Sequence, residues 1–196
     1  MAYAKTNLSA STAASTNRFV TSTNMIVGAY TLANSTASHG AGFKVTATIT
    51  AVTGNDTAGT LVVVGTNLAG QAVTETITLT AGSGGSGSQI FRSLTSVTGA
   101  GWVINTGNDT IVVGQAVDAY VMDGSGELYA VVVNTAQATS IALADAGGTF
   151  ATLKASIVEN TYYYRCEISG FLKITSAGTV NYTLIHSPSQ PTYATS

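Results

Sequence analysis

The stretch FKVTATITA, residues 43–51, alternates apolar and polar side chains at every position. Successive side chains of a β-strand point to opposite faces of a sheet, whereas neighbours on one helix face are three or four residues apart. A period of two therefore predicts a strand with one face in a core and the other in solvent. The expected inward residues are Phe43, Val45, Ala47, Ile49 and Ala51.

Similar strand-like runs recur along the chain, separated by turn sequences rich in Asn, Asp and Gly. In AVTETITLT we expect Val73, Ile77 and Leu79 on one face, with Glu75 between them and the threonines on the other face. A repeated TGNDT, at residues 53–57 and 106–110, suggests two similar turn-strand units. The other runs are MIVGAYTL (25–32), TLVVVG (60–65), QIFRSLTSVTG (89–99), LYAVVV (128–133), SIALAD (140–145), ATLKASIV (151–158), YYYRCEIS (162–169), FLKITS (171–176) and VNYTLIH (180–186).

The composition fits a sheet protein with an unusually uncharged surface. Charged residues make up 8% of the 196 residues, against about 25% in an ordinary globular domain. Thr suits half-exposed strands, and the 21 glycines suit turns. Because surface charge keeps free proteins apart, we expect partner subunits to cover much of this surface in an assembly. The alternative is a monomer whose Ser, Thr and Asn coat is polar enough for solubility.

Charge and hydropathy argue against several classes of partner. Lys and Arg number 7 and Asp and Glu number 9, giving a net charge of −2 without a basic stripe, so we expect no nucleic-acid partner. No apolar run approaches the roughly 20 residues that span a bilayer, so we expect no membrane partner. The first residues lack the apolar region of a signal peptide, and the chain has one Cys. Both features favour a protein made in a cytoplasm.

The spacing of strand and turn signals predicts two modules with extended ends. We expect an N-terminal arm over residues 1–24, a β-sandwich module over 25–120, a second β module over 121–187 and a C-terminal arm over 188–196. The N-terminal arm shows almost no periodic apolar pattern, and strands spaced roughly 8–12 residues apart are typical of a small sandwich. The predicted fold class is all-β, with two small β-sandwich or jelly-roll-like modules and extended N- and C-terminal arms.

The segment AGSGGSGS, residues 81–88, is too rich in Gly and Ser to predict a packed element. A phosphate-binding loop would end in Lys followed by Ser or Thr, and a helix would come after it. Here a strand-like run comes next instead. We therefore expect a flexible connection between two strands.

Residues that could carry chemistry are few and scattered. Alternation places Cys166 on the face of Tyr162, Tyr164 and Ile168, which favours a small buried side chain over a nucleophile activated by His186. His39 and His186 are too isolated for a metal site, and DGSGE, residues 123–127, favours a turn over a calcium loop. Neither a facing carboxylate pair nor a Ser-His-Asp arrangement is evident. We predict no catalytic residue, no metal site, no cofactor and no enzymatic activity.

Exposed aromatic side chains are the remaining candidates for contacts. In the run of three tyrosines from Tyr162 to Tyr164, at least one ring must face away from the strand's own core. Tyr buries a large area and keeps a polar tip, so Tyr163 is a candidate contact for a subunit or a ligand. A sheet-face tyrosine wetted at its hydroxyl is the alternative. Arg165, on the same face, and Arg18 and Phe19, in the N-terminal arm, complete the predicted interface residues.

Two long segments give the chain a family resemblance. They are VVVGTNLAGQAVTETITLT…FRSLTSVTGAG and GTFATLKASIVENTYYYRCEISGFLKITSAGTVNYTLIH, within residues 43–186. In their low charge, Thr and Gly content and two β modules, they resemble virion structural proteins of tailed bacteriophages, most of all capsid decoration (cement) proteins.

The resemblance implies a non-enzymatic protein that binds the head surface and reinforces joints between subunits of the major capsid protein. It also implies synthesis in the bacterial host cytoplasm and a final location on the capsid surface of the virion. A homo-oligomer is expected, with a trimer favoured because three-fold joints recur over an icosahedral lattice. The alternative is a receptor- or glycan-binding module of a tail or fibre, with Trp102 or the tyrosine run lining its groove.

Overall fold

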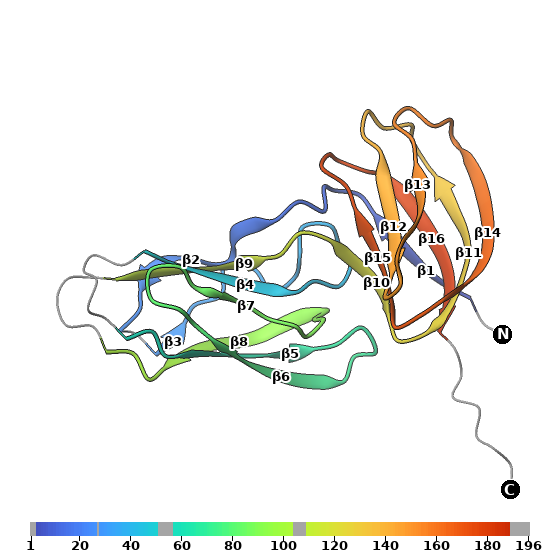
Figure 1. Ribbon diagram of the computed structural model, residues 1–196. Coiled ribbons are helices and arrows are strands. Elements are labelled where there is room, and N and C mark those ends of the chain that lie inside the picture. Colours follow the sequence, from blue (N-terminus) through green and yellow to red (C-terminus); the bar gives the residue numbers. More distant parts are fainter. Residues whose placement is uncertain (1–2, 27, 51–56, 104–108, 189–196) are drawn as a thin grey trace, which may run out of the picture. The chain divides into compact units, whose positions relative to one another are not determined.

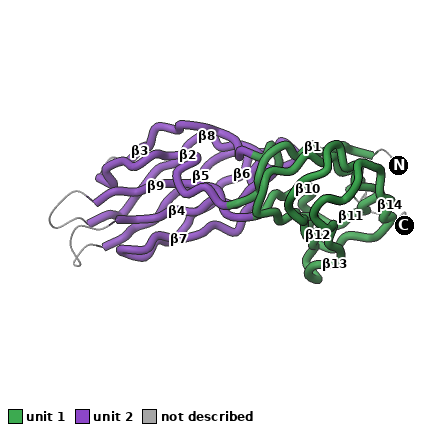
Figure 2. The backbone as a smooth tube through the Cα atoms, turned by 90° about the horizontal axis from the view of Figure 1, so that it is seen from above, with its two compact units in different colours: residues 1–13, 39–41, 118–196 green, residues 14–38, 42–117 purple. Residues whose placement is uncertain are grey.

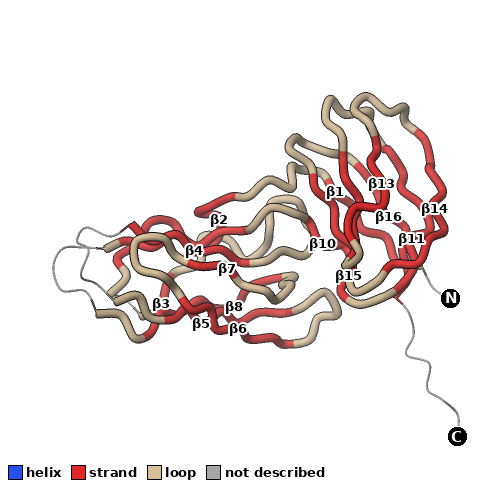
Figure 3. The backbone as a smooth tube through the Cα atoms, in the orientation of Figure 1, coloured by secondary structure: helices blue, strands red, loops and turns tan. Residues whose placement is uncertain are grey.

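The computed structural model describes residues 3–26, 28–50, 57–103 and 109–188. In these residues the chain forms strands β1 to β16 and no helix, which confirms the predicted all-β class (Figures 1 and 3). The strands make four antiparallel sheets of four strands each. No described segment is a helix long and apolar enough to cross a membrane.

The chain divides into two compact units, coloured green and purple in Figure 2. Unit 1 consists of residues 1–13, 39–41 and 118–196, and unit 2 consists of residues 14–38 and 42–117. The sequence predicted a boundary between the modules after residue 120. The structure places it after Val117, because Ala119 and Tyr120 already belong to the first strand of unit 1 beyond the boundary.

Unit 2 is a sandwich of two sheets around one core. Their strand orders are β2-β9-β4-β7 and β3-β8-β5-β6. The predicted alternation of β4 is confirmed, since Val45, Ala47 and Ile49 are buried and pack with Leu61 and Val63 of the other sheet. The strand bounds are β2 (Ser15–Asn24), β3 (Ala29–Tyr30), β4 (Val45–Thr50), β5 (Thr60–Thr66), β6 (Ala72–Thr78), β7 (Gly85–Ser86), β8 (Ser93–Ala100) and β9 (Thr110–Gln115).

Unit 1 is a second sandwich with its own core. Its sheets have the orders β1-β16-β11-β14 and β10-β15-β12-β13. Leu128 and Leu184 of the first sheet pack with Leu143 and Ile174 of the second. The strand bounds are β1 (Ala4–Leu8), β10 (Ala119–Asp123), β11 (Gly126–Val133), β12 (Ile141–Asp145), β13 (Gly148–Leu153), β14 (Asn160–Ile168), β15 (Phe171–Thr175) and β16 (Tyr182–Pro188).

The described part of residues 1–24 forms two strands where the sequence predicted an extended arm. β1 pairs antiparallel with β16, and its last residue, Leu8, is fully buried in the core of unit 1. β2 pairs with β9 and buries Phe19 and Val20 in the core of unit 2. Both are edge strands in which most side chains are at least partly exposed. Such strands need few apolar residues, so the periodic signal was too weak to predict them.

Residues 81–88 connect β6 to β8, as predicted, but they include a short paired strand that the sequence did not predict. β7 within this segment pairs with β4. A Cβ atom at Gly84, whose φ is +107°, would lie 2.0 Å from the carbonyl oxygen of Ala47, so only glycine permits this approach. After β7, the carboxylate of Glu75 accepts hydrogen bonds from the backbone N–H and the hydroxyl of Ser88. The glycines therefore allow close contact between backbones.

The remaining expected strands are present with shifted ends. The run over residues 25–32 contributes only the short β3. The runs predicted between residues 128 and 186 each overlap a strand, but the run over 151–158 meets β13 only at its first three residues. On β6 the expected face is confirmed, because Ile77 is buried and the threonines are exposed. Three predicted features lie wholly or mostly outside the described residues: Ala51, the TGNDT sequences at 53–57 and 106–110, and the C-terminal arm beyond Pro188.

Candidate functional site

Three tyrosines and an arginine lie together on the outward face of the sheet β1-β16-β11-β14. The ring of Tyr129 is central, with its centroid 4.8 Å from that of Tyr3 and 5.5 Å from that of Tyr163. The guanidinium carbon of Arg165 lies 5.2 Å from the Tyr129 centroid and 5.9 Å from the Tyr163 centroid. Arg165 Nη2 also donates a hydrogen bond to Tyr129 Oη at 3.3 Å. We call these four residues the tyrosine–arginine cluster.

A β-bulge explains why these side chains meet. Against β16, Tyr129 is an extra residue of β11 between Leu128 and Ala130. Against β14 the extra residue is on β14, where Tyr164 and Arg165 together stand opposite Tyr129. On the neighbouring strand β14, Arg165 has a φ of +49°, a conformation uncommon for residues other than glycine. Bulges redirect side chains without changing which residues enter the core on either side. The bulge therefore places Tyr129 beside Arg165 on the outward face.

The predicted faces of β14 are confirmed. Tyr162, Tyr164 and Cys166 pack against the core of unit 1. Tyr163 and Arg165 point outward, and the side chain of Tyr163 is 63% exposed. The structure thus brings two of the four predicted interface residues together in one cluster. The cation–π and edge-to-face contacts of the cluster hold its rings and its guanidinium in place.

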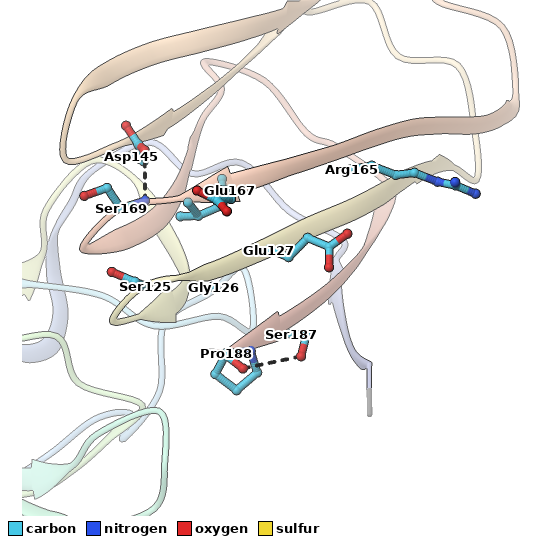
Figure 4. Close-up of a pocket in the computed structure, with 10 residues that line it drawn as sticks. Ser125, Gly126, Glu127, Asp145, Arg165, Glu167, Ser169, Ser187 and Pro188 are labelled. Atoms are coloured by element: carbon cyan, nitrogen blue, oxygen red, sulfur yellow. Dashed lines mark hydrogen bonds between the residues drawn. The ribbon is translucent and has the colours of Figure 1, made fainter. Parts of the chain in front are cut away.

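A surface groove of about 800 Å³ adjoins the cluster (Figure 4). Glu127 on β11 stands opposite Glu167 on β14 and opposite Ser187 on β16, so three polar side chains form a row across the sheet. The hydroxyl of Tyr3 donates a hydrogen bond to Glu127 Oε2 at 3.4 Å. The groove is lined by Ser125, Gly126, Glu127, Asp145, Arg165, Glu167, Ile168, Ser169, Ser187 and Pro188.

The charges of this groove are not paired with each other. The ion pair present among the described residues lies outside the groove, where Lys173 Nζ is 2.7 Å from Asp118 Oδ2. Two carboxylates directly opposite each other on neighbouring strands repel, which costs on the order of 0.5 kcal/mol at an exposed site. Burial and the nearby carboxylate of Glu127 raise the pKa of the Tyr3 hydroxyl, so this hydroxyl remains a hydrogen-bond donor at neutral pH.

Cys166 and His186 are not arranged as a nucleophile and its base. Their strands, β14 and β16, are separated by β11. Burial, together with the nearby carboxylates of Asp145 and Glu127, raises the pKa of the Cys166 thiol and keeps it protonated at neutral pH. His186 is buried and its Nε2 lies 3.0 Å from Thr6 Oγ1. The thiol therefore lacks the depressed pKa of a reactive cysteine.

The other residues considered for chemistry have structural roles. His39 is buried, and its Nδ1 accepts a hydrogen bond from the backbone N–H of Ala41 at 3.2 Å. Residues 123–127 form the predicted turn between β10 and β11, with Gly124 at a φ of +103°. No group of three or more metal-ligating side chains occurs among the described residues.

Three other residues named in the sequence analysis belong to unit 2, whereas the tyrosine–arginine cluster belongs to unit 1. They are Arg18, Phe19 and Trp102. Phe19, predicted at an interface, is instead fully buried in the core, with its ring centroid 4.6 Å from that of Phe43. Arg18 is half-buried, and its Nε donates a hydrogen bond to the Thr36 carbonyl oxygen at 2.9 Å. Trp102 is partly buried against the core of unit 2, and it also lines a surface groove of about 540 Å³ together with Ile26 and Val103.

A second surface of note is the outward face of the sheet β3-β8-β5-β6 in unit 2. Val62 is central on this face, between Thr98 of β8 and Thr76 of β6, and Val64 lies between Ser96 and Thr74. None of its side chains carries a charge. We call this surface the threonine face and define it by Thr60, Val62, Val64, Thr66, Thr74, Thr76, Thr78, Ser96 and Thr98.

Sequence reasoning missed Tyr3, Tyr129 and Glu127 as members of the site. Tyr3 lay in the predicted arm, and Tyr129 lay within an ordinary strand-like run. The outward position of Tyr163 was the only part of this site that the sequence could predict, because the bulge that places Tyr129 beside it does not change the apolar–polar alternation.

Comparison with protein-family models, curated proteins and solved structures finds no match for this chain.

Proposed function

We propose that this protein is a non-enzymatic capsid decoration (cement) protein of a tailed bacteriophage. In this role it binds the head surface and reinforces joints between subunits of the major capsid protein. It is made in the bacterial host cytoplasm and acts on the capsid surface of the virion as a homo-oligomer, with a trimer favoured. The threonine face of unit 2 is the observation that supports this role best.

The threonine face has the properties of a surface that another protein covers. The centres of protein interfaces are depleted of charged side chains relative to the rest of the surface. Here three neighbouring strands present Thr, Val, Ser and Ala to the outside, and none of these side chains is charged. Thr60, Val62, Val64 and Thr66 are already half-buried by their neighbours on the sheet. Covering an uncharged face avoids the large free-energy cost of desolvating a charge.

A lysine on this face, beside the central Val62, tests the proposal. Thr76 is exposed, so the substitution Thr76→Lys should leave the fold intact. Covering the face would then bury an unpaired ammonium group, which should lower the occupancy of the protein on purified phage heads by about tenfold or more. Occupancy is measured by quantitative mass spectrometry of gradient-purified particles after the protein is added to heads that lack it.

Thr149→Lys is the matched control, because Thr149 is also an exposed strand threonine but lies on β13 of unit 1. Gold-labelled antibody against the protein, imaged on particles, gives an independent measurement of location. Even labelling of heads supports the decoration role. Labelling confined to tails, or equal occupancy of the Thr76→Lys and wild-type proteins, contradicts it.

A further inference from the structure

The groove beside the tyrosine–arginine cluster has charged side chains and neighbouring aromatic rings, which are typical of a site that binds a small ligand. It is lined by the guanidinium of Arg165 and the carboxylates of Glu127, Glu167 and Asp145, and the exposed rings of the cluster lie beside it. Its volume of about 800 Å³ is within the roughly 300–1,000 Å³ typical of small-ligand sites. Because the threonine face lies in unit 2, a ligand site in this groove of unit 1 does not depend on the proposed decoration role.

The rings provide a preorganised apolar surface. Tyr163 is 63% exposed and Tyr3 is 43% exposed, although both rings are held by contacts with Tyr129. Tyrosine has few rotatable bonds, and contacts with neighbouring rings restrict them further. A ligand that covers these rings therefore gains apolar contact at a small cost in side-chain entropy.

The polar groups around the rings select the charge of the ligand. Arg165 offers only hydrogen-bond donors, whereas Glu127 and Glu167 offer only acceptors. None of the three forms an ion pair with a described residue. The third carboxylate of the groove, Asp145, already accepts hydrogen bonds from the backbone N–H groups of Gly147 and Ser169, so Arg165, Glu127 and Glu167 remain for a ligand. An anionic ligand would be repelled by the carboxylates, and a cationic ligand would be repelled by the guanidinium. A neutral ligand whose groups both donate and accept hydrogen bonds satisfies all three side chains.

From this geometry we propose that the groove and the tyrosine–arginine cluster bind a neutral oligosaccharide. Each sugar hydroxyl can donate to Glu127 or Glu167 and accept from Arg165, and the C–H face of a pyranose ring is apolar enough to stack on Tyr163. The site requires no covalent step and no metal.

A printed array of neutral and acidic oligosaccharides, probed with the full-length protein, tests this proposal, with calorimetric titration of the neutral oligosaccharide that binds best. We expect wild-type protein to bind a neutral oligosaccharide. Tyr163→Ala should weaken that binding by about tenfold, as expected for a central aromatic contact. Phe150→Ala is the matched control and should bind like wild type, because Phe150 is a similarly exposed ring (40%) on β13 in the other sheet of unit 1.

Two further measurements separate a neutral ligand from a charged one. Binding of a neutral sugar should change little between about 0.05 and 0.5 M salt, because screening acts on charge pairs. Glu167→Gln should retain binding within a few-fold, since the amide oxygen still accepts a hydrogen bond. The proposal is overturned if no neutral oligosaccharide binds, if acidic sugars bind better than neutral ones, or if Tyr163→Ala binds as tightly as wild type.

Discussion

At the scale of single residues, buried polar side chains make the stability of this protein depend on pH. His186 points into unit 1 from β16 and is 6% exposed. Its Nε2 lies beside Thr6 Oγ1, but its Nδ1 has no hydrogen-bond partner in the structure. A protonated imidazole carries a donor on both nitrogens, so protonation would leave a buried charge with one unsatisfied donor. Burial accordingly lowers the pKa of His186 below its usual 6.5.

The lowered pKa predicts a loss of stability on the acid side. As the pH falls through 6.5, the unfolded chain takes up a proton at this position before the folded chain does. The stabilising contribution of neutral His186 is therefore fully present above pH 6.5 and is lost as the pH falls from there toward the folded-state pKa. Denaturant unfolding of wild type and of His186→Gln, at pH about 7.5 and about 5.5, measures this effect.

The two proteins share every other titrating group, so the difference between their pH dependences isolates His186. We expect the variant to lose less stability than wild type between the two pH values. An equal loss in both proteins would show that His186 is protonated as readily in the folded state as in the unfolded one.

At the scale of strands, edge pairing in unit 2 depends on backbones that approach without side chains between them. β7 is a two-residue strand that adds an edge to β4, and Gly84 precedes it at a φ of +107°. Glu75 of β6 then holds the next residues by accepting hydrogen bonds from the backbone N–H groups of Ser88 and Gln89. The segment is thus attached on two sides, to one strand of each sheet.

Gly84→Ala should detach this edge and lower the stability of unit 2. A Cβ atom there would lie 2.0 Å from the carbonyl oxygen of Ala47, so the strands must separate. We expect a loss of about 2–4 kcal/mol in the free energy of unfolding, the sum of positive-φ strain and lost pairing. Gly82→Ala is the control, because Gly82 also has a positive φ of +71° but nothing within 4 Å of its Cβ position.

Chemical denaturation monitored by the fluorescence of Trp102, the single tryptophan and a residue of unit 2, reports this difference. The control should lose only the strain term, about 1 kcal/mol. Similar losses for the two variants would mean that the approach of Gly84 to β4 contributes nothing beyond its backbone conformation.

At the scale of the whole molecule, the two units have separate cores but share an interleaved chain. The described residues form two hydrophobic clusters, one in each unit. Unit 1 takes β1 from the start of the chain and Ala41 from a short excursion out of unit 2, in addition to the residues after Val117. Unit 1 therefore cannot be made from the C-terminal part of the chain alone.

Leu8→Ala should destabilise unit 1 without directly affecting unit 2. Leu8 is fully buried in the core of unit 1. Removing its isobutyl group should cost about 2–5 kcal/mol. Differential scanning calorimetry should show two unfolding transitions, of which the variant lowers one. Lys5→Ala, an exposed position on the same strand, is the control and should shift neither transition. A uniform shift of both transitions in Leu8→Ala would show that the units unfold as one.

The sequence by itself determined the properties that depend on neighbouring residues. The period of two predicted β4, β6 and the two faces of β14, because the direction of a side chain along a strand is set by its own backbone. That local rule placed Tyr163 and Arg165 outward and Cys166 inward, as the structure confirms.

Tertiary structure decided which strands pair and how closely they approach. The pairing of β1 with β16 joins the two ends of the described chain, and it depends on the burial of Leu8 in a core that those ends build together. The bulge at Tyr129 and the approach of Gly84 to β4 likewise result from contacts between strands distant in sequence. The packing free energy of the whole folded molecule selects such contacts. The residues of one strand alone do not identify the strand with which it pairs.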